Sequence, residues 1–414
     1  MNQVKRYKAI IFVLTIIALL ISNESAYAAN ASRMLGFSAR DSAMAGATTA
    51  SSEDTSCLIK NPAGLVRIGN RIDASYENIL LHDVTMKTEG ALTSAGLSQK
   101  SNIKYIPGGN AGISYRIPGT DKYPVSVGFG MFTIGGMANN YARSRISAAL
   151  LANGGNYDKM LDMRTMRFAP GIAAAFNDKL SFGMTANIDL QALRTNLARG
   201  ATPPFTETSG AGKWDITVGA GFTLGLLYKY NDMLSLGASY ESHGWQQHHL
   251  KYKDCLPYID EPPIVSVGIS IKPIKNLELT YDTRYINWTD VKLARMSPRQ
   301  GGFGWRDQWV FAVGSEYTTF EDKLKLRLGY NYGRSPIQHN VIFANALMPV
   351  IIEHHLTTGF SYFFTKDLSL DLAWEHQFKK GIVDSGGDSM DANGTGTKVT
   401  AACDVITAGL GYKF

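Results

Sequence analysis

Three things are scarce in this 414-residue chain: cysteine, charge and long apolar runs. Its three cysteines, Cys57, Cys255 and Cys403, lie far apart, which excludes a small scaffold stapled by several disulfides and leaves open whether two of them bridge. Only 18% of the residues are charged, and a formal net charge of +6 is too diffuse to predict a nucleic-acid partner. Beyond the N-terminus no apolar run approaches the roughly 20 residues of a membrane-spanning helix, so no helical span is expected there.

The N-terminal residues 1–28 have the order of a secretory signal peptide. Basic Lys5, Arg6 and Lys8 precede an apolar run over residues 9–21, and a small-residue cleavage pattern follows at residues 26–28. The alternative is an N-terminal membrane anchor, but the apolar run is shorter than the roughly 20 residues that a spanning helix needs. The signal predicts export across the inner membrane.

Apolar and polar residues alternate with a period of two along several segments, which is typical of β-strands and not of helices. In one of them Leu324, Leu326 and Leu328 alternate with Lys325 and Arg327. If such strands form a β-barrel in a membrane, a Lys or Arg that faces the bilayer midplane is destabilising by about 2–4 kcal/mol. The charged face of each strand must then point into the barrel. The residues expected to line the interior are Lys323, Lys325, Arg327, Glu278, Asp282, Arg284, Asp371 and Glu375.

The final segment places Ile406, Ala408, Leu410, Tyr412 and Phe414 on one face and ends the chain on an aromatic residue. This ending resembles the assembly signal of outer-membrane barrels. A soluble β-sandwich also alternates, so alternation by itself does not separate the two classes.

Connection lengths do separate them. Fourteen strands are expected near residues 72, 111, 123, 166, 180, 213, 233, 263, 276, 306, 322, 353, 367 and 403. Short turns at 118–122, 177–178, 230–232, 272–275, 320–322 and 365–367 alternate with long loops near 82–110, 135–165, 194–212, 244–262, 289–305, 334–352 and 380–401. Residues 70–414 are therefore predicted to form an all-β, 14-stranded antiparallel transmembrane β-barrel in the outer membrane, with both termini periplasmic.

Residues 29–69 precede the first strand and lack strand alternation. They combine small residues and breakers, including Asn61, Pro62, Ala63 and Gly64, with apolar side chains such as Leu58. A disordered periplasmic tail is one interpretation. The apolar content favours the other, an ordered plug inside the barrel.

The motif Asn61-Pro62-Ala63-Gly64, followed by the block 286–290, the tryptophan-containing block 305–309 and the segments 314–317, 326–330 and 335–337, resembles the FadL/TodX family of outer-membrane transporters of hydrophobic compounds. The resemblance covers nearly the whole chain after the signal peptide. It implies a plugged fourteen-stranded barrel that captures long-chain fatty acids or aromatic hydrocarbons among its extracellular loops and releases them sideways, where the third strand kinks.

Two candidate sites follow. Glycine weakens strand pairing, so Gly128, Phe129 and Gly130 are candidates for the lateral opening, with ordinary barrel curvature as the alternative. Two long loops are too apolar for solvated segments and predict a ligand groove, unless they pack on each other. The candidate binding residues in them are Ile146, Leu150, Leu151, Met160, Leu161, Phe343, Leu347 and Met348.

No pattern indicates an enzyme, a cofactor or a metal site. His243, His248 and His249 cluster in a loop, and His354 and His355 are adjacent, but neither group has metal-ligand spacing. No catalytic motif of a hydrolase or metalloprotease occurs. The expected partners are a hydrophobic small molecule, outer-membrane lipid and lipopolysaccharide, with the chain acting as a monomer. The rival interpretation is a general porin or a surface adhesin on the same barrel.

Overall fold

The computed structural model describes residues 30–88, 97–141, 159–196, 212–253, 256, 258–387 and 395–414. The predicted signal peptide lies outside these residues. None of the helices in the described ranges is long and apolar enough to cross a membrane.

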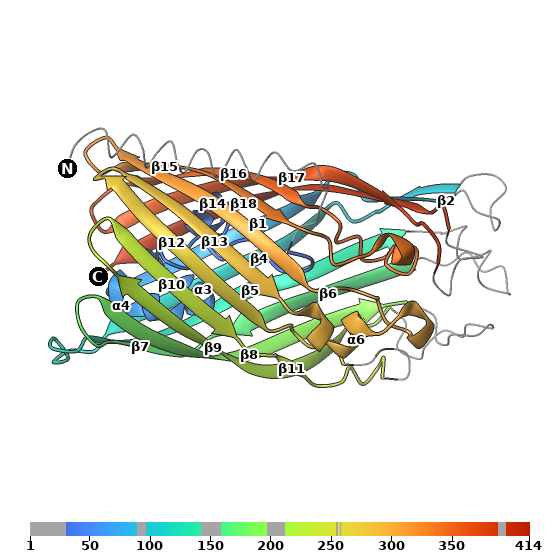
Figure 1. The fold of residues 1–414 in the computed structure, drawn as a ribbon, viewed down its shortest axis with the longest axis horizontal. Helices are drawn as coiled ribbons and strands as arrows, with labels where there is room; N and C mark the ends of the chain where they lie inside the picture. The colour runs from blue at the N-terminus through green and yellow to red at the C-terminus, as the bar shows by residue number, and fades with distance from the viewer. Residues whose placement is uncertain are drawn as a thin grey trace.

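The described chain forms a closed antiparallel barrel of fourteen strands (Figure 1). Closure comes from β1 (Arg71–Leu81), which pairs with both β4 (Tyr105–Arg116) and β18 (Lys398–Lys413). The fourth strand is divided into β6 (Lys159–Phe168) and β7 (Gly171–Ala175), and the seventh into β10 (Leu234–Glu241) and β11 (Trp245–Gln246). The other strands are β5 (Val125–Tyr141), β8 (Leu180–Thr195), β9 (Asp215–Lys229), β12 (Ile264–Ile274), β13 (Leu277–Ile286), β14 (Gln308–Thr319), β15 (Leu324–Gly333), β16 (His354–Phe363) and β17 (Leu368–Val383).

The two faces of the strands divide as predicted. Arg327 and Glu278 are buried inside, whereas Leu326 and Leu328 are exposed on the outer surface, Leu328 by 55%. Lys323 was also predicted to line the interior, but it lies in the turn before β15 and not on a strand. Its side chain is exposed at the rim of an interior cavity. A belt of outward apolar side chains around a polar interior is the arrangement that a lipid environment demands.

Short and long connections lie at opposite ends of the barrel (Figure 1). The short turns occur where predicted, except that β12 runs to Ile274, so the turn predicted at 272–275 is shorter. The long connections carry the hairpin of β2 (Thr85–Thr88) and β3 (Leu97–Lys100) and the short helices η2 (Trp288–Asp290), α6 (Lys292–Arg295), η3 (Pro298–Gln300) and η4 (His339–Val341). We call these the short-turn end and the long-loop end.

Residues 30–69, called the plug below, fill the interior instead of forming a solvated tail. Their helices are α2 (Ala39–Ala43), α3 (Cys57–Lys60), η1 (Pro62–Gly64) and α4 (Leu65–Ile68), and nearly every side chain is buried. Helix α2 contacts β15–β18, while η1 contacts β7–β9 on another part of the wall. The plug therefore closes the lumen by packing against several sides of the barrel.

Candidate functional site

The third strand of the barrel, β5, changes partners halfway along its length. Its first half pairs with β4 from Ser126 to Phe132, opposite Arg116 to Asn110. Beyond Phe132 the ladder to β4 stops, although β4 continues to Tyr105 beside β1. On its other edge β5 pairs with β6 across a register shift between Thr133 and Gly135. Residues 105–109 of β4 and 133–141 of β5 therefore have no ladder pairing with each other, although each is paired with its other neighbour. We call these two segments the unpaired stretch.

Side chains bridge the point where this ladder ends. The Thr133 hydroxyl donates to the carbonyl oxygen of Gly109 at 3.1 Å, and the backbone N–H of Gly109 donates back to that hydroxyl at 3.1 Å. The Thr133 N–H donates to the Asn110 side-chain oxygen at 3.0 Å. Single side-chain hydrogen bonds contribute only about 0.5–1.5 kcal/mol each, so this contact is weaker than a continuous ladder.

The plug pairs with β5 beside the unpaired stretch. Met34 N–H donates to the carbonyl of Ile134 at 3.1 Å, and Gly136 N–H donates to that of Ser32 at 2.9 Å. A Cβ atom on Gly135 would lie 2.4 Å from the Ser32 carbonyl oxygen, so only glycine allows the plug backbone this close. The first residues of the plug thus support β5 from inside, where β4 no longer does.

The predicted opening residues lie in the closed part of the wall. Gly128 is paired with β4 and β7, and Gly130 exchanges hydrogen bonds with Ala169. Phe129 faces outward, 48% exposed. A Cβ on Gly128 would approach a methyl carbon of Leu65 to 2.8 Å, so this glycine makes room for the plug. The interruption of pairing begins a few residues later, after Phe132.

An inner cavity of about 130 Å³ lies against the unpaired stretch. Ile106 of β4 lines it from one side of the stretch, and Gly136, Met137 and Ala138 of β5 line it from the other. Plug residues 30–35 and apolar side chains of β1 complete much of the wall. An apolar molecule in this cavity would therefore touch both strands where their pairing is interrupted.

An outer cavity of about 40 Å³ lies toward the long loops and shares Ser32 and Met137 with the inner one. Its lining is almost entirely apolar and includes Trp288 and Trp305, whose rings meet edge to face with centroids 5.0 Å apart. The Trp305 indole N–H donates to Asn345 at 2.8 Å. Met137 and Ser32 are thus the boundary between the two cavities.

The candidate binding residues are only partly brought together. Leu161 of β6 and Met348 of the loop before β16 both line the outer cavity, as the idea of a groove between the two loops requires. Leu347 is buried in the same apolar cluster, while Met160 and Phe343 are half-buried and line neither cavity. Ile146, Leu150 and Leu151 lie outside the described residues.

The sequence reasoning missed the contribution of Met137, Trp288 and Trp305 to the cavities. The sequence places the two tryptophans only within the family motifs, and the signal available is the occurrence of two tryptophans in or beside a loop that was expected to be extracellular. Met137 carried no signal, because it looks like any apolar residue of an alternating strand.

The Asn-Pro-Ala-Gly motif holds the plug to the wall. The Asn61 amide donates to the backbone carbonyls of Thr49, at 2.8 Å, and Leu226, at 3.0 Å, and its oxygen accepts from the N–H of Ala63 at 3.2 Å. The last contact caps η1, and Pro62 occupies its first position, where a missing N–H costs nothing. A Cβ on Gly225 would lie 2.2 Å from the Asn61 oxygen, so the barrel wall also needs glycine here.

Buried ion pairs fill the lumen below the cavities. Arg33 pairs with Glu241 at 2.8 Å and with Glu261 at 3.0 Å, and Arg167 pairs with Asp189 at 2.7 Å and with Glu241 at 2.6 Å. All of these side chains are at least nine-tenths buried. An apolar solute that moved along the barrel axis would have to separate these charges, and breaking a buried pair costs about 3–5 kcal/mol.

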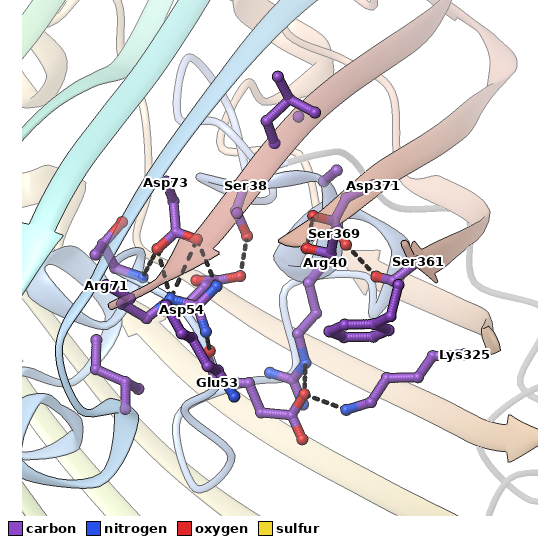
Figure 2. Close-up of a pocket in the computed structure, with 18 of the residues that line it drawn as sticks. Ser38, Arg40, Glu53, Asp54, Arg71, Asp73, Lys325, Ser361, Ser369 and Asp371 are labelled. Atoms are coloured by element: carbon purple, nitrogen blue, oxygen red, sulfur yellow. Dashed lines mark hydrogen bonds and ion pairs between the residues drawn. The ribbon is translucent and has the colours of Figure 1, made fainter. Parts of the chain in front are cut away.

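A second charged network surrounds Arg40 in the plug (Figure 2). Its guanidinium lies within 3.4 Å of Glu53, Glu278 and Glu316, the one carboxylate trio of the described residues that is close enough to share a metal ion. The cation position is thus taken by an arginine. Burial alone would raise the pKa of Glu53, but Arg40 and Lys325 hold that pKa well below its usual range.

A third cavity, of about 610 Å³, opens at the short-turn end beneath the plug (Figure 2). Arg40, Glu53, Arg71, Asp73 and Lys325 are among the charged residues that line it. Such a lining suits water and offers an apolar solute no favourable contact.

Two of the loop histidines singled out by the sequence have ordinary partners in the structure. His243 pairs with Asp260 and Asp290, and the His248 ring donates a hydrogen bond to the carbonyl oxygen of Leu256 at 2.7 Å. Cys57 and Cys403 are free and buried. Cys255 lies outside the described residues.

A family model described as "Outer membrane protein transport protein (OMPP1/FadL/TodX)" matches residues 19–414. Among solved structures, the Pseudomonas putida toluene transporter TodX is similar with a TM-score of 0.68 and 19% identity, covering 92% of this chain and 99% of its own. The Ralstonia pickettii toluene transporter TbuX gives 0.64 and 18%, covering 92% and 99%. A Pseudomonas aeruginosa FadL homologue gives 0.63 and 15%, covering 93% and 100%. Among curated protein sequences, none matches significantly.

Proposed function

Because the chain belongs to the OMPP1/FadL/TodX family of outer-membrane transport proteins, we propose that it takes up small hydrophobic molecules passively through the outer membrane. The protein is an outer-membrane β-barrel and a transport protein, not an enzyme. Monoaromatic hydrocarbons, as carried by the toluene transporters of similar fold, or long-chain fatty acids are the proposed solutes. The observation that carries the proposal is the inner apolar cavity that reaches both strands of the unpaired stretch.

Capture begins at the long-loop end, which faces the cell exterior in this proposal. A solute leaves water for the apolar outer cavity, where Trp288 and Trp305 offer aromatic faces. Burial of apolar surface contributes roughly 25 cal/mol per Å², so no energy source is needed for this step. The candidate residues Leu161 and Met348 contribute to the wall of this cavity.

Transfer to the inner cavity requires a displacement at Met137 and Ser32, which line both cavities. Methionine is unbranched and flexible, so its side chain can move aside at low cost. Ser32 belongs to the plug segment that is hydrogen-bonded to β5. A shift of these first plug residues therefore widens the inner cavity and loosens the support of β5 in the same step.

Release is proposed to occur sideways, between β4 and β5, into the membrane. The axial route meets the buried ion pairs of Arg33 and Arg167. The lateral route meets neutral hydrogen bonds: those between Thr133 and β4, and those that Asn140 makes with Ser101 and Asn102. The opening therefore lies at 133–136 in this proposal, beyond the candidates Gly128, Phe129 and Gly130. The exposed apolar face contacts membrane lipid and, in the outer leaflet, lipopolysaccharide, and the chain acts as a monomer with its termini in the periplasm.

Substitution at the boundary of the two cavities tests this route. Met137→Trp should fill the passage and lower uptake of labelled toluene or oleate by cells several-fold, while Met137→Leu, of similar volume, should retain uptake. Heat-modifiability on gels shows whether both variants fold. Equal uptake by the Trp variant would refute passage through this point.

A general porin or adhesin is distinguished by liposome swelling with sugars. The plug fills the lumen and its buried charges are paired, so swelling should be no faster than in protein-free liposomes. Rapid swelling, combined with no uptake of hydrophobic solutes, would replace the proposed function with that of a porin.

A further inference from the structure

The inner cavity is not uniformly apolar, and three of its polar lining residues lie in one row across the barrel wall. Cys403 of β18 is paired with Gln377 of β17, which is paired with His355 of β16. All three line the cavity, as does Glu375, two residues before Gln377 on the same strand. A hydrocarbon in this cavity would therefore lie against a polar strip on one side.

Gln377 is oriented by its neighbours in this strip. Its amide donates to the Glu375 carboxylate at 2.7 Å, and its oxygen accepts from the Cys403 thiol at 2.6 Å. These contacts fix which way the glutamine amide points. Free hydrogen-bonding capacity, in groups without any partner among the described residues, lies elsewhere on the cavity wall.

That free capacity belongs to His355 and Asn30. Each is only 1% exposed, and each lines the inner cavity. Within the described part of the chain, both ring nitrogens of His355 and both amide atoms of Asn30 lack a hydrogen-bond partner. Buried polar groups in native proteins are nearly always paired, so two unpaired side chains that face one cavity indicate a missing polar partner.

We infer that the inner cavity binds an apolar molecule that carries a hydroxyl group, with His355 and Asn30 as its hydrogen-bonding partners. This inference rests on the proposed uptake function and specifies its solute class. A hydroxyl donates and accepts, as does a neutral imidazole, whose two nitrogens are one donor and one acceptor. A pure hydrocarbon would leave both side chains unpaired and so binds less tightly.

Size and charge narrow the class further. The volume of about 130 Å³ is close to that of an engineered apolar cavity of about 150 Å³ that binds benzene, so a single six-membered ring fits. A carboxylate is disfavoured, because Glu375 lines the cavity and Arg33, the one Arg or Lys in the described lining, is already paired with Glu241 and Glu261. The expected ligand is therefore a phenol or a ring alcohol of similar size.

The test compares p-cresol with p-xylene, which differ by a hydroxyl in place of a methyl group. Equilibrium binding of each labelled compound is measured on the full mature protein in amphipol, with protein-free amphipol as the blank. p-Cresol should bind about tenfold more tightly, although it is the less apolar compound; a factor of ten corresponds to 1.4 kcal/mol, the scale of one hydrogen bond. 4-Methylbenzoate should bind more weakly than p-cresol.

Variants assign the preference to His355. His355→Leu should reverse the order of the two compounds, and His355→Gln, which retains a donor and an acceptor, should restore it. His354→Leu is the matched control, because His354 lies on the opposite face of the same strand beside Tyr330 and should leave the preference unchanged. The Gln variant also keeps the test decisive if the Leu variant does not fold.

The outcomes separate the two proposals. Preference of the wild-type protein for p-xylene, or tighter binding of 4-methylbenzoate than of p-cresol, overturns the hydroxyl inference and leaves the uptake function standing. An unchanged preference in His355→Leu overturns the role of His355. Absence of specific binding for all three compounds overturns the cavity as a ligand site, and with it the proposed uptake route.

Discussion

Lateral release can be blocked by a disulfide placed across the start of the unpaired stretch. A Cβ built on Gly108 of β4 lies 3.5 Å from the Cβ of Thr133 of β5, within the range of about 3.5–4.5 Å that a disulfide requires. Gly108→Cys combined with Thr133→Cys should therefore oxidise without backbone movement. The bond joins the two strands at the point where the hydrogen bonds of Thr133 with Gly109 and Asn110 now bridge them.

The expected effect is a loss of uptake that follows the cross-linked fraction. The bond closes a loop of about 25 residues, for which chain entropy predicts roughly 3.5 kcal/mol of stabilisation, and it must break before the strands can separate. Uptake of labelled solute by cells should fall close to background when oxidation is complete and should return on addition of a reductant. Cross-linking is measured by the gel shift of the unheated and heated protein.

A second cysteine pair controls for the disulfide itself. Ala111→Cys with Met131→Cys joins the same two strands at directly paired positions in the closed part of the wall, and should leave uptake unchanged. Cys57 and Cys403 are buried and can remain, while Cys255→Ser removes the third thiol. A fully oxidised Gly108/Thr133 pair that transports at the wild-type rate would refute release between β4 and β5.

Three further outcomes are expected. Asn61→Ala removes the helix cap and two hydrogen bonds to backbone carbonyls, so it should weaken plug docking by about 2–3 kcal/mol, seen as faster hydrogen exchange in the plug with unchanged heat-modifiability of the barrel. Arg33→Ala leaves Glu241 and Glu261 buried without this cation and should destabilise the plug by about 3–5 kcal/mol. Liposome swelling with sugars should then be faster than with the wild-type protein. Swelling no faster than wild type would show that these ion pairs do not seal the lumen. Burial, together with nearby Arg284, lowers the pKa of Lys60 from 10.5 to about 8. Between these pH values the unfolded chain binds a proton that the folded protein does not, so plug stability should rise from pH 8 to 10.5. Lys60→Met should abolish that rise in hydrogen-exchange measurements.

The fold followed from local properties of the chain. Alternation placed Leu326 and Leu328 outside and Arg327 inside because side chains on a strand point to opposite faces, and a charge facing hydrocarbon is too costly to tolerate. Turn length marked the two ends of the barrel, because a tight turn needs specific residues within a few positions. Both signals are contained in neighbouring residues, so the sequence by itself sufficed.

The site depended on distant residues meeting. Leu161 and Met348 were predictable as apolar loop residues, but their meeting with Trp288 and Met137 depends on where each long loop folds back over the barrel. The first plug residues decide where β5 is supported from inside, and no local pattern encodes a contact made by a segment some hundred residues earlier.

The glycines illustrate the difference most clearly. Sequence alone determined that Gly128 and Gly130 weaken a strand, and it could not say whether the reason was an opening or a tight neighbour. The tertiary structure places a leucine of the plug against Gly128 and the plug backbone against Gly135. The same residue type therefore makes room for a side chain where the wall is closed, and for a backbone segment within the unpaired stretch. The physical reason is that a glycine reports how closely another chain segment approaches, and that distance exists only in the folded barrel.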